Sequence, residues 1–163
     1  NFTPMKNAIA LLLVGLMLTS CSFSAGTHKD LGTGLSYNYN GFSVDEVLLA
    51  DADNNVMSNN EVELNSEISI VVQGLSNYEL KDDKAYPGLM MQVLDKQGVA
   101  IIDEADLFAG SNGYSTSDAS IVRGTVTVGD PMVSGQTYLM KIRVWDKNKP
   151  ENELTAEVDF VVK

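Results

Sequence analysis

Short apolar runs alternate with clusters of Gly, Asn, Asp and Pro from about residue 41 to the end of the chain. Within these runs, apolar and polar side chains tend to follow one another with a period of two. The last run shows the pattern clearly: Ala156, Val158, Phe160 and Val162 alternate with Thr155, Glu157, Asp159 and Val161. This period is typical of a half-buried β-strand, which turns one set of side chains to the core and the other to water.

The runs predict strands over residues 44–50, 61–73, 89–94, 99–102, 121–128, 137–145 and 154–162, with a bend near residues 65–66 in the second. In that second run we expect alternate side chains to face opposite sides of the sheet. The side chains expected to face the core are Ile68, Ile70 and Val72. Those expected to face solvent are Ser69, Val71 and Gln73. No run of comparable length has the period of a helix.

The connections between the runs favour hairpins. Asp95-Lys96-Gln97-Gly98 suits a tight turn with the glycine at positive φ, and residues 146–150 suit a longer loop between the last two strands. About seven strands at this spacing, each with an apolar face to bury, predict an all-β fold. We expect a single antiparallel β-sandwich over residues 41–163.

The stretch GQTYLMKIRVWDKNKPENELTAEVDFVV, residues 135–162, resembles the final hairpin of immunoglobulin-like and cadherin-like modules. Shared features are a Gly, a following Tyr, alternation into an Asp, a polar loop and an alternating last strand. The resemblance implies an immunoglobulin-like sandwich whose penultimate strand holds Tyr138, Leu139 or Met140, Ile142 and Val144. Adhesion, scaffolding or carbohydrate binding follow from it only by analogy, because this fold serves many functions.

The start of the chain has a different pattern. Met5 is a plausible initiator, so residues 1–4 read as stray, and Lys6 precedes an apolar run of eleven residues from Ala8 to Leu18. A membrane-spanning helix needs about 20 apolar residues, so this run fits the hydrophobic region of an export signal. We therefore predict that residues 1–20 are a signal peptide and are removed.

Leu18-Thr19-Ser20-Cys21 is similar to the lipobox of bacterial lipoproteins, and Cys21 is the only cysteine. The resemblance implies that acyl chains such as palmitate are attached at Cys21 and that the chain is cut before it. Several acyl chains give stable attachment to a membrane. We expect a lipid-anchored protein of the bacterial cell envelope, at the outer membrane. In some Gram-negative lipoproteins, acidic residues directly after the cysteine accompany display on the cell surface. Here the first acidic residue after Cys21 is Asp30, so the sequence leaves open whether the protein faces the periplasm or the cell exterior. The alternatives are an incidental cysteine in a secreted protein and an uncleaved anchor.

Residues 21–40 are rich in Gly, Ser, Thr and Asn and lack periodic apolar positions. Such a composition buries too little surface to offset the entropy of ordering, so it predicts a flexible tether that lifts the sandwich off the membrane. His28, the only histidine of the chain, falls in this segment and is expected to be a solvated linker residue.

Charge and residue inventory exclude several functions. The chain has a net charge of −11, which disfavours nucleic acid as a partner because nucleic acids are bound through Lys and Arg. A lone cysteine allows no intramolecular disulfide. With a single histidine in the predicted tether, no nucleophile has a histidine base, and we expect no enzyme. The cluster Asp103, Glu104 and Asp106 leaves carboxylate catalysis as an alternative to a solvated face.

Asp51, Asp53 and Asn55 have the alternating oxygen-ligand spacing that begins many calcium loops, and Asp51-Ala52-Asp53 faintly resembles the Asp-Ala-Asp element of cadherin repeats. The loop glycine is missing, and Val62 stands where a bidentate Glu would be needed. Asp and Asn are also ordinary turn residues. A turn is therefore the main prediction and a calcium site the alternative. No other cofactor is expected.

Tyr78, Tyr86, Tyr114 and Trp145 lie outside the clearest alternating positions. Aromatic faces in loops anchor protein interfaces or stack on sugars. Of these four, Tyr114, Trp145 and Tyr86 are the candidate ligand or partner residues. The sequence predicts a non-catalytic module that binds an envelope protein, with a polysaccharide-binding lipoprotein for nutrient uptake or adhesion as the alternative.

Overall fold

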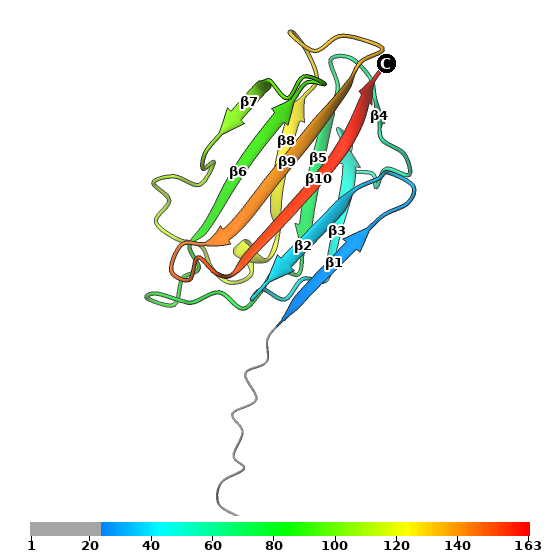
Figure 1. Ribbon diagram of the computed structural model, residues 1–163. Helices are drawn as coiled ribbons and strands as arrows, with labels where there is room; N and C mark the ends of the chain where they lie inside the picture. Colours follow the sequence, from blue (N-terminus) through cyan, green and yellow to red (C-terminus); the bar gives the residue numbers. More distant parts are fainter. Residues whose placement is uncertain (1–23) are drawn as a thin grey trace, which may run out of the picture.

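Two β-sheets face each other in the computed structural model, which describes residues 24–163 (Figure 1). The larger sheet has the order β1 (Ala25–Lys29), β2 (Ser36–Asn40), β10 (Glu153–Val162), β9 (Thr137–Asp146), β6 (Pro87–Leu94) and β7 (Ala100–Glu104). The short β4 (Glu61–Val62) pairs in parallel with the end of β10. The smaller sheet contains β3 (Glu46–Asp51), β5 (Glu67–Gln73) and β8 (Val122–Thr127), in that order. The predicted all-β sandwich is confirmed.

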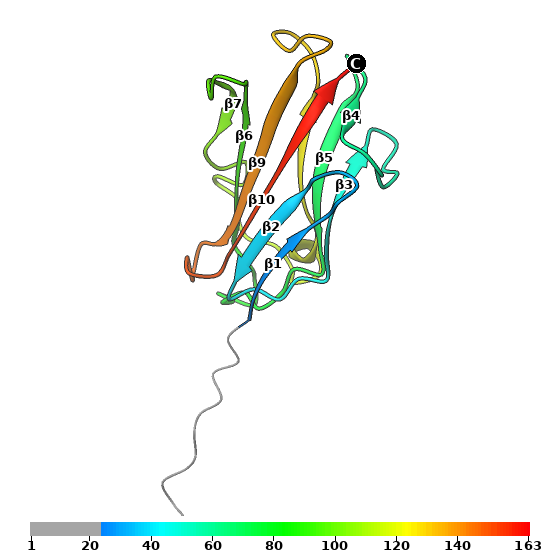
Figure 2. The ribbon, with the colours of Figure 1, turned by 45° about the vertical axis from the view of Figure 1, so that its right-hand side comes forward.

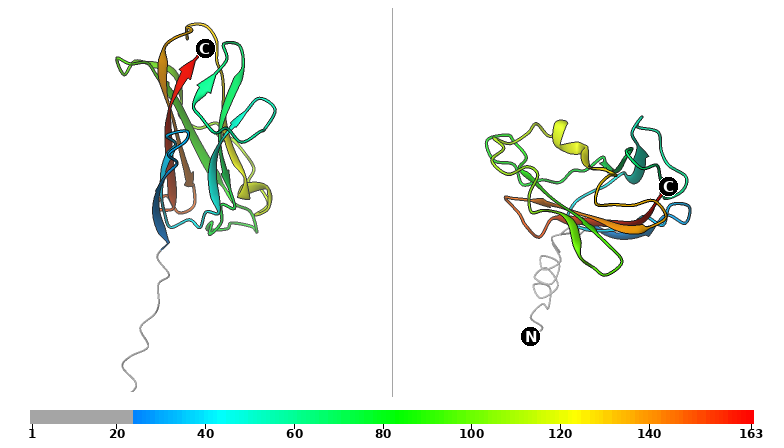
Figure 3. Two further views of the ribbon diagram at one scale, coloured as in Figure 1. Left: turned by 90° about the vertical axis from the view of Figure 1, so that its right-hand side faces the viewer. Right: turned by 90° about the horizontal axis from the view of Figure 1, so that it is seen from above.

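The core lies between the sheets and contains the side chains that the period of two assigns to it (Figure 3). In β10, Leu154, Ala156, Val158, Phe160 and Val162 are all buried, and the residues between them are exposed or half-buried. β9 repeats this pattern. The seven predicted strands are found within a few residues of their expected bounds, and the second is divided into β4 and β5 near residues 65–66 as predicted. The only helix within residues 24–163 is the 3-10 turn η1 (Asp118–Ser120).

One expectation for β5 is wrong. Ser69 and Val71 were expected to face solvent, yet both are buried. β5 is the central strand of the small sheet, so side chains of β3 and β8 flank its outer face. Leu48 and Arg123 stand opposite Val71, and the Arg123 side chain donates a hydrogen bond to the Ser69 hydroxyl over 3.3 Å. A narrow three-stranded sheet thus buries its middle strand on both faces.

The prediction of a flexible tether over residues 21–40 is also wrong for the residues that the structure describes. Ala25–Lys29 and Ser36–Asn40 form the β1–β2 hairpin, and β2 pairs with β10 over its whole length. His28 therefore lies in a strand. Its ring stacks on Tyr37 with centroids 4.9 Å apart. Cross-strand pairing and aromatic contacts order this hairpin despite its polar composition.

The loops lie at two ends of the sandwich (Figures 1 and 2). We call one the Ser24 end; it comprises residues 41–45, 74–86, 105–121 and 147–152. The other, called the Lys163 end, comprises residues 52–66, 95–99 and 128–136. The β1–β2 turn of residues 30–35 lies between the two ends, at the side of the molecule. At the first, the Gly41 amide donates to the Ser24 carbonyl over 2.7 Å; at the second, the Leu64 amide donates to the Lys163 carbonyl over 3.2 Å. Within residues 24–163, no helix is both long and apolar enough to cross a bilayer.

Candidate functional site

The predicted ligand residues Tyr86 and Tyr114 both lie at the Ser24 end. Ala85 and Tyr114 exchange two backbone hydrogen bonds of 2.9 Å, which bring the loop of residues 105–121 against the start of β6. The Tyr86 ring covers Gly113, where a β-carbon would lie 2.8 Å from the ring. The Tyr114 ring meets Phe108 edge-on with centroids 5.5 Å apart. Residues 86 and 113 therefore share one face of this bridge and residues 85 and 114 share the other, so the Tyr86 and Tyr114 rings point to opposite sides.

A largely apolar hollow of about 410 Å³ lies beside η1 and the aromatic pair of Phe108 and Tyr114. Its walls include Pro87, Phe108, Tyr114, Asp118, Ile121 and Val122. Ile121 is 59% exposed at the rim, although it is a large apolar side chain. The one carboxylate among the walls, that of Asp118, accepts a hydrogen bond from the Ser115 hydroxyl over 2.7 Å. The hollow thus offers apolar surface with little polar chemistry.

The third candidate, Trp145, does not line the hollow. It points to the outer face of the large sheet, where its ring covers Gly88 on the neighbouring β6; a β-carbon on Gly88 would lie 2.2 Å from that ring. The Arg143 guanidinium stands 5.0 Å from the ring centroid and also pairs with Glu153 over 2.8 Å. Contacts within the sheet therefore account for the position of Trp145.

Asp106 fastens the loop that carries Phe108. One carboxylate oxygen accepts hydrogen bonds from the Leu89 and Phe108 amides at 3.1 and 2.9 Å, and the other pairs with Lys147 at 2.7 Å. Burial raises the pKa of Asp106, but the hydrogen bonds and the charge of Lys147 together outweigh it and lower this pKa. Asp106 therefore stays ionised and holds the wall of the hollow in place.

The structure does not gather the acidic cluster of residues 103–106 into a catalytic pair. Asp103 and Glu104 are consecutive residues of β7, so their side chains leave opposite faces of the sheet. Asp103 accepts a hydrogen bond from the Gln92 side chain over 2.8 Å, and Asp106 is engaged with Lys147. Asp103 and Asp106 thus have separate structural contacts.

Asp51, Asp53 and Asn55 form the turn that the sequence favoured. A single Asp51 oxygen accepts the amides of Asp53 and Asn55 at 2.9 and 2.8 Å. Hydrogen bonds from the Asn55 side chain and backbone, and then from the Asp53 backbone, lower the pKa of Asp51. Within the described part of the chain, no three His, Cys, Asp or Glu side chains are grouped to hold a metal ion. Calcium at this turn stays a prediction.

A polar cluster at the Ser24 end was not predicted from the sequence. The buried Asp146 carboxylate accepts the amides of Glu79 and Asn148 at 2.6 and 2.9 Å. Asn152, also buried, donates its side-chain amide to the Asn77 carbonyl over 2.8 Å. Asn77 in turn donates to the Gly41 carbonyl. The cluster joins three loops, and the recurrence of Asn in the loop sequences SNYE and DKNKPEN was its only signal.

Tyr78 belongs to this same region and is a structural residue. Its hydroxyl donates to the Ala119 carbonyl over 3.1 Å, and its ring meets Phe42 edge-on at 5.0 Å. Burial raises the pKa of Tyr78, and the negative charge of Asp146 raises it further. Tyr78 thus ties η1 to the core and remains a hydrogen-bond donor.

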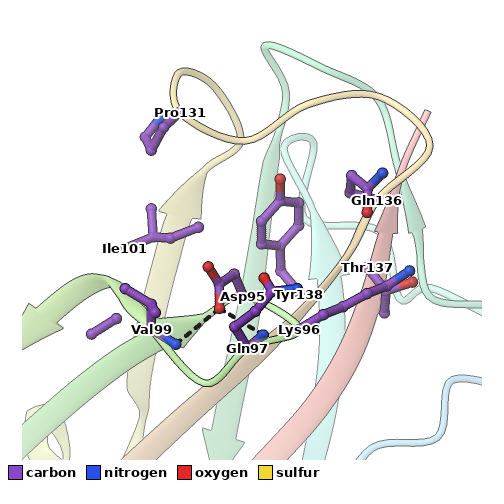
Figure 4. A pocket seen from close by; sticks show the side chains of 10 residues that line it. Asp95, Lys96, Gln97, Val99, Ile101, Pro131, Gln136, Thr137 and Tyr138 are labelled. Atoms are coloured by element: carbon purple, nitrogen blue, oxygen red, sulfur yellow. Dashed lines mark hydrogen bonds between the residues drawn. The ribbon is translucent and has the colours of Figure 1, made fainter.

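A second cavity, of about 520 Å³, opens at the Lys163 end (Figure 4). Figure 4 shows Val99, Ile101 and Pro131 on one side of Tyr138, with Gln136 and Thr137 on the other. The Tyr138 hydroxyl accepts the Val133 amide over 3.0 Å, and Asp95 accepts the amides of Gln97 and Val99. These polar groups serve the local turns, and none of the predicted ligand residues lines this cavity.

Cys21, the predicted lipidation site, lies outside the described residues.

No protein-family model and no curated protein matches this chain. Among solved structures, it is similar to a superoxide reductase (neelaredoxin) from Ignicoccus hospitalis at 6% identity and a TM-score of 0.42, over 75% of this chain and 82% of that one. It is also similar to chicken MD-1 complexed with lipid IVa at 9% identity and a TM-score of 0.37, over 85% and 98%. Neither likeness supports an inference about what this chain binds or catalyses.

Proposed function

We propose that this chain is a non-catalytic binding module of the bacterial cell envelope, anchored by lipid at Cys21, which engages a protein partner as an accessory of a larger outer-membrane complex. The hollow beside η1 is the main observation that supports the proposal. It combines apolar walls, an exposed rim residue and loops that are fastened to a rigid sandwich. Such an arrangement suits a partner that inserts an apolar side chain.

The rigidity of the hollow favours binding. Asp106 and Lys147 hold one wall, and the backbone bridge between Ala85 and Tyr114 holds another. A partner then loses little free energy in ordering these loops, so more of the gain from covering Ile121 remains as affinity. Since the chain has a net charge of −11, basic residues around the partner's inserted side chain would increase the rate at which the two proteins associate.

Site-specific photo-cross-linking in cells tests the partner site. A photoreactive amino acid replaces Ile121, and the matched control replaces Val133, which is 53% exposed at the opposite end. We expect one cross-linked envelope protein from position 121 and none from position 133. Ile121→Asp should abolish co-purification of that same protein. Equal cross-linking at both positions, or none at position 121, would contradict the proposal.

Mass spectrometry of the mature protein tests the anchor. The expected product begins at Cys21 and carries acyl chains on it. A free Cys21 thiol or a retained leader would refute membrane attachment by lipid.

Polysaccharide binding is the second candidate function, and the aromatic pair of Phe108 and Tyr114, which lines the hollow, favours it. A glycan array separates the two functions: reproducible hits that Tyr114→Ala abolishes would support sugar stacking at this aromatic pair. Trp145→Ala makes the same test on the outer face of the sheet. Because the Trp145 ring covers Gly88, that variant requires a melting curve to confirm that it is folded.

A further inference from the structure

The first described residues are fastened to the loops of the Ser24 end. The Ser24 carbonyl accepts the Gly41 amide over 2.7 Å, and the Gly41 carbonyl accepts the side-chain amide of Asn77. Asn77 is joined in turn to the buried Asn152. The position of Ser24 relative to the loop of residues 74–86 is therefore fixed by a chain of hydrogen bonds.

Only three residue steps separate Cys21 from Ser24. An extended chain gains at most about 3.6 Å per residue, so the two positions lie within about 11 Å of each other. The tether of residues 21–40 expected from the sequence would have reached about 70 Å when extended. Since residues 25–40 belong to the sandwich instead, an anchor at Cys21 leaves the Ser24 end little freedom to move away from a membrane.

The surface at this end has chemistry that a lipid headgroup region accepts. Leu80 is 46% exposed and lines an apolar hollow of about 380 Å³ together with Leu75 and Tyr78. The adjoining tip, residues 81–84, has two lysines and two aspartates. Its charges balance, so anionic lipid headgroups do not repel this tip, whereas they would repel a surface with the net negative charge of the whole chain. An exposed leucine beside balanced charges favours contact with the interface of a bilayer.

We propose that the Ser24 end of the sandwich rests on the lipid surface that holds Cys21, with Leu80 at the contact. This inference rests on the proposed lipid anchor and adds an orientation to it. The hollow beside η1 then lies close to the membrane, at the side of the contact, and is open to a partner embedded in the same bilayer. The Lys163 end, with Val99 and Val133, faces away from the lipid.

Fluorescence quenching by lipid tests the orientation. Acylated Leu80→Cys protein, labelled with an environment-sensitive fluorophore, is placed in phosphatidylcholine vesicles that contain a spin-labelled phospholipid. Acylation leaves Cys21 without a free thiol, so only the new cysteine is labelled. The matched control is Val99→Cys, 60% exposed at the other end; Leu31→Cys reports on the β1–β2 side of the molecule. We expect quenching at position 80 to exceed that at positions 99 and 31 several-fold.

Three outcomes would overturn the inference: quenching at none of the positions, equal quenching at positions 80 and 99, or preferential quenching at position 31, which would mean that the sandwich lies on its side. Lys81→Cys provides the same measurement if Leu80→Cys does not fold. Mass spectrometry of the same samples separates the two proposals. Acylated Cys21 without quenching at position 80 removes only the orientation, whereas an unmodified Cys21 removes the anchor and the orientation together.

Discussion

The β9–β10 and β1–β2 hairpins belong to one sheet but are stabilised in different ways. Both strands of β9–β10 have ten residues, and every second side chain is buried in the core. The strands of β1–β2 have five residues each, and no side chain within them is fully buried. The long hairpin is ordered by burial of apolar surface, while the short one is ordered by its pairing with β10 and by its aromatic contacts.

The contrast shows that strand pairing extends a sheet beyond the limits of its core. Once β10 exists, its free edge offers hydrogen-bond partners to any neighbouring chain segment of suitable conformation. Tyr37 and Tyr39 then bury part of their rings against the core, with little further loss of conformational entropy because the strand is already ordered. We therefore expect mutations to cost much more stability in the long hairpin than in the short one.

The largest difference should come from removing one aromatic ring in each hairpin. Phe160→Ala in β10 empties a buried position that packs against Tyr138, and we expect a loss of about 3–5 kcal/mol in the free energy of unfolding. Tyr37→Ala removes a half-buried ring and should cost clearly less. Urea denaturation of both variants measures the two losses. Equal losses would mean that the β1–β2 hairpin is part of the cooperative core.

The next effect concerns the buried aspartate at the end of β9. Asp146→Ala leaves the amides of Glu79 and Asn148 without their acceptor, so we expect a loss of about 2–4 kcal/mol. Asp30, which starts the turn of the short hairpin, is exposed, so Asp30→Ala should cost less. Thermal unfolding measures both changes. A larger effect of Asp30→Ala would contradict the ranking of the two hairpins.

Each hairpin also has an aromatic ring that covers a glycine on the neighbouring strand. A β-carbon at Gly88 would meet the body of the Trp145 ring at 2.2 Å, whereas one at Gly26 would meet the far end of the Tyr39 ring at 2.6 Å. Because the far end of a side chain moves more easily, Gly88→Ala should cost about 1–3 kcal/mol and Gly26→Ala less. A double-mutant cycle with Trp145→Ala should show coupling; additive losses would exclude the clash as the cause.

The smallest effect is the response of the short hairpin to acid. The Thr33 hydroxyl, and then the amides of Thr33 and Gly32, donate to Asp30 and lower its pKa below the ordinary value of 3.8. Because the pKa of Asp30 is lower in the folded state than in the unfolded state, its ionised carboxylate stabilises the folded hairpin at pH values above 3.8. This stabilisation is lost as the pH falls through the pKa of the folded state. Carboxyl NMR titration should give a midpoint below 3.8, and Thr33→Val should raise it. An unchanged midpoint in Thr33→Val would refute the role of the hydroxyl.

The sequence predicted the parts of the fold that depend on alternating burial. The strands from residue 44 onward and the positive φ of Gly98 follow from the period of two and from turn chemistry. The β1–β2 hairpin could not be recognised, because its sequence, AGTHK followed by SYNYN, has no apolar alternation. Its order depends on β10, which lies more than a hundred residues away in the chain. The burial of Ser69 and Val71 likewise depends on their two neighbouring strands.

The candidate site was predictable only in its residue types. Tyr86 and Tyr114 were recognisable as loop aromatics, and their role in binding stays a prediction. Nothing local indicated that Phe108 pairs with Tyr114 or that Gly113 lies against the Tyr86 ring. Trp145 was equally conspicuous in the sequence, yet a glycine on the neighbouring strand gives it a packing partner. The contacts of Asp146 and Asn152 could not be predicted either, because their hydrogen-bond partners lie in loops about seventy residues away. Long-range pairing decides which loop aromatics are available to a ligand.

Among the strands of residues 24–163, β1 is the last on its side of the large sheet, so one row of its backbone groups has no neighbouring strand there. A free row of this kind is where copies of a β-protein can add to one another and begin to aggregate. Here the free edge is only five residues long, contains Gly26 and ends in Lys29. The positive charges of Lys29 in successive copies would repel one another if copies added edge to edge. These features disfavour open-ended self-association, even where many copies are crowded together.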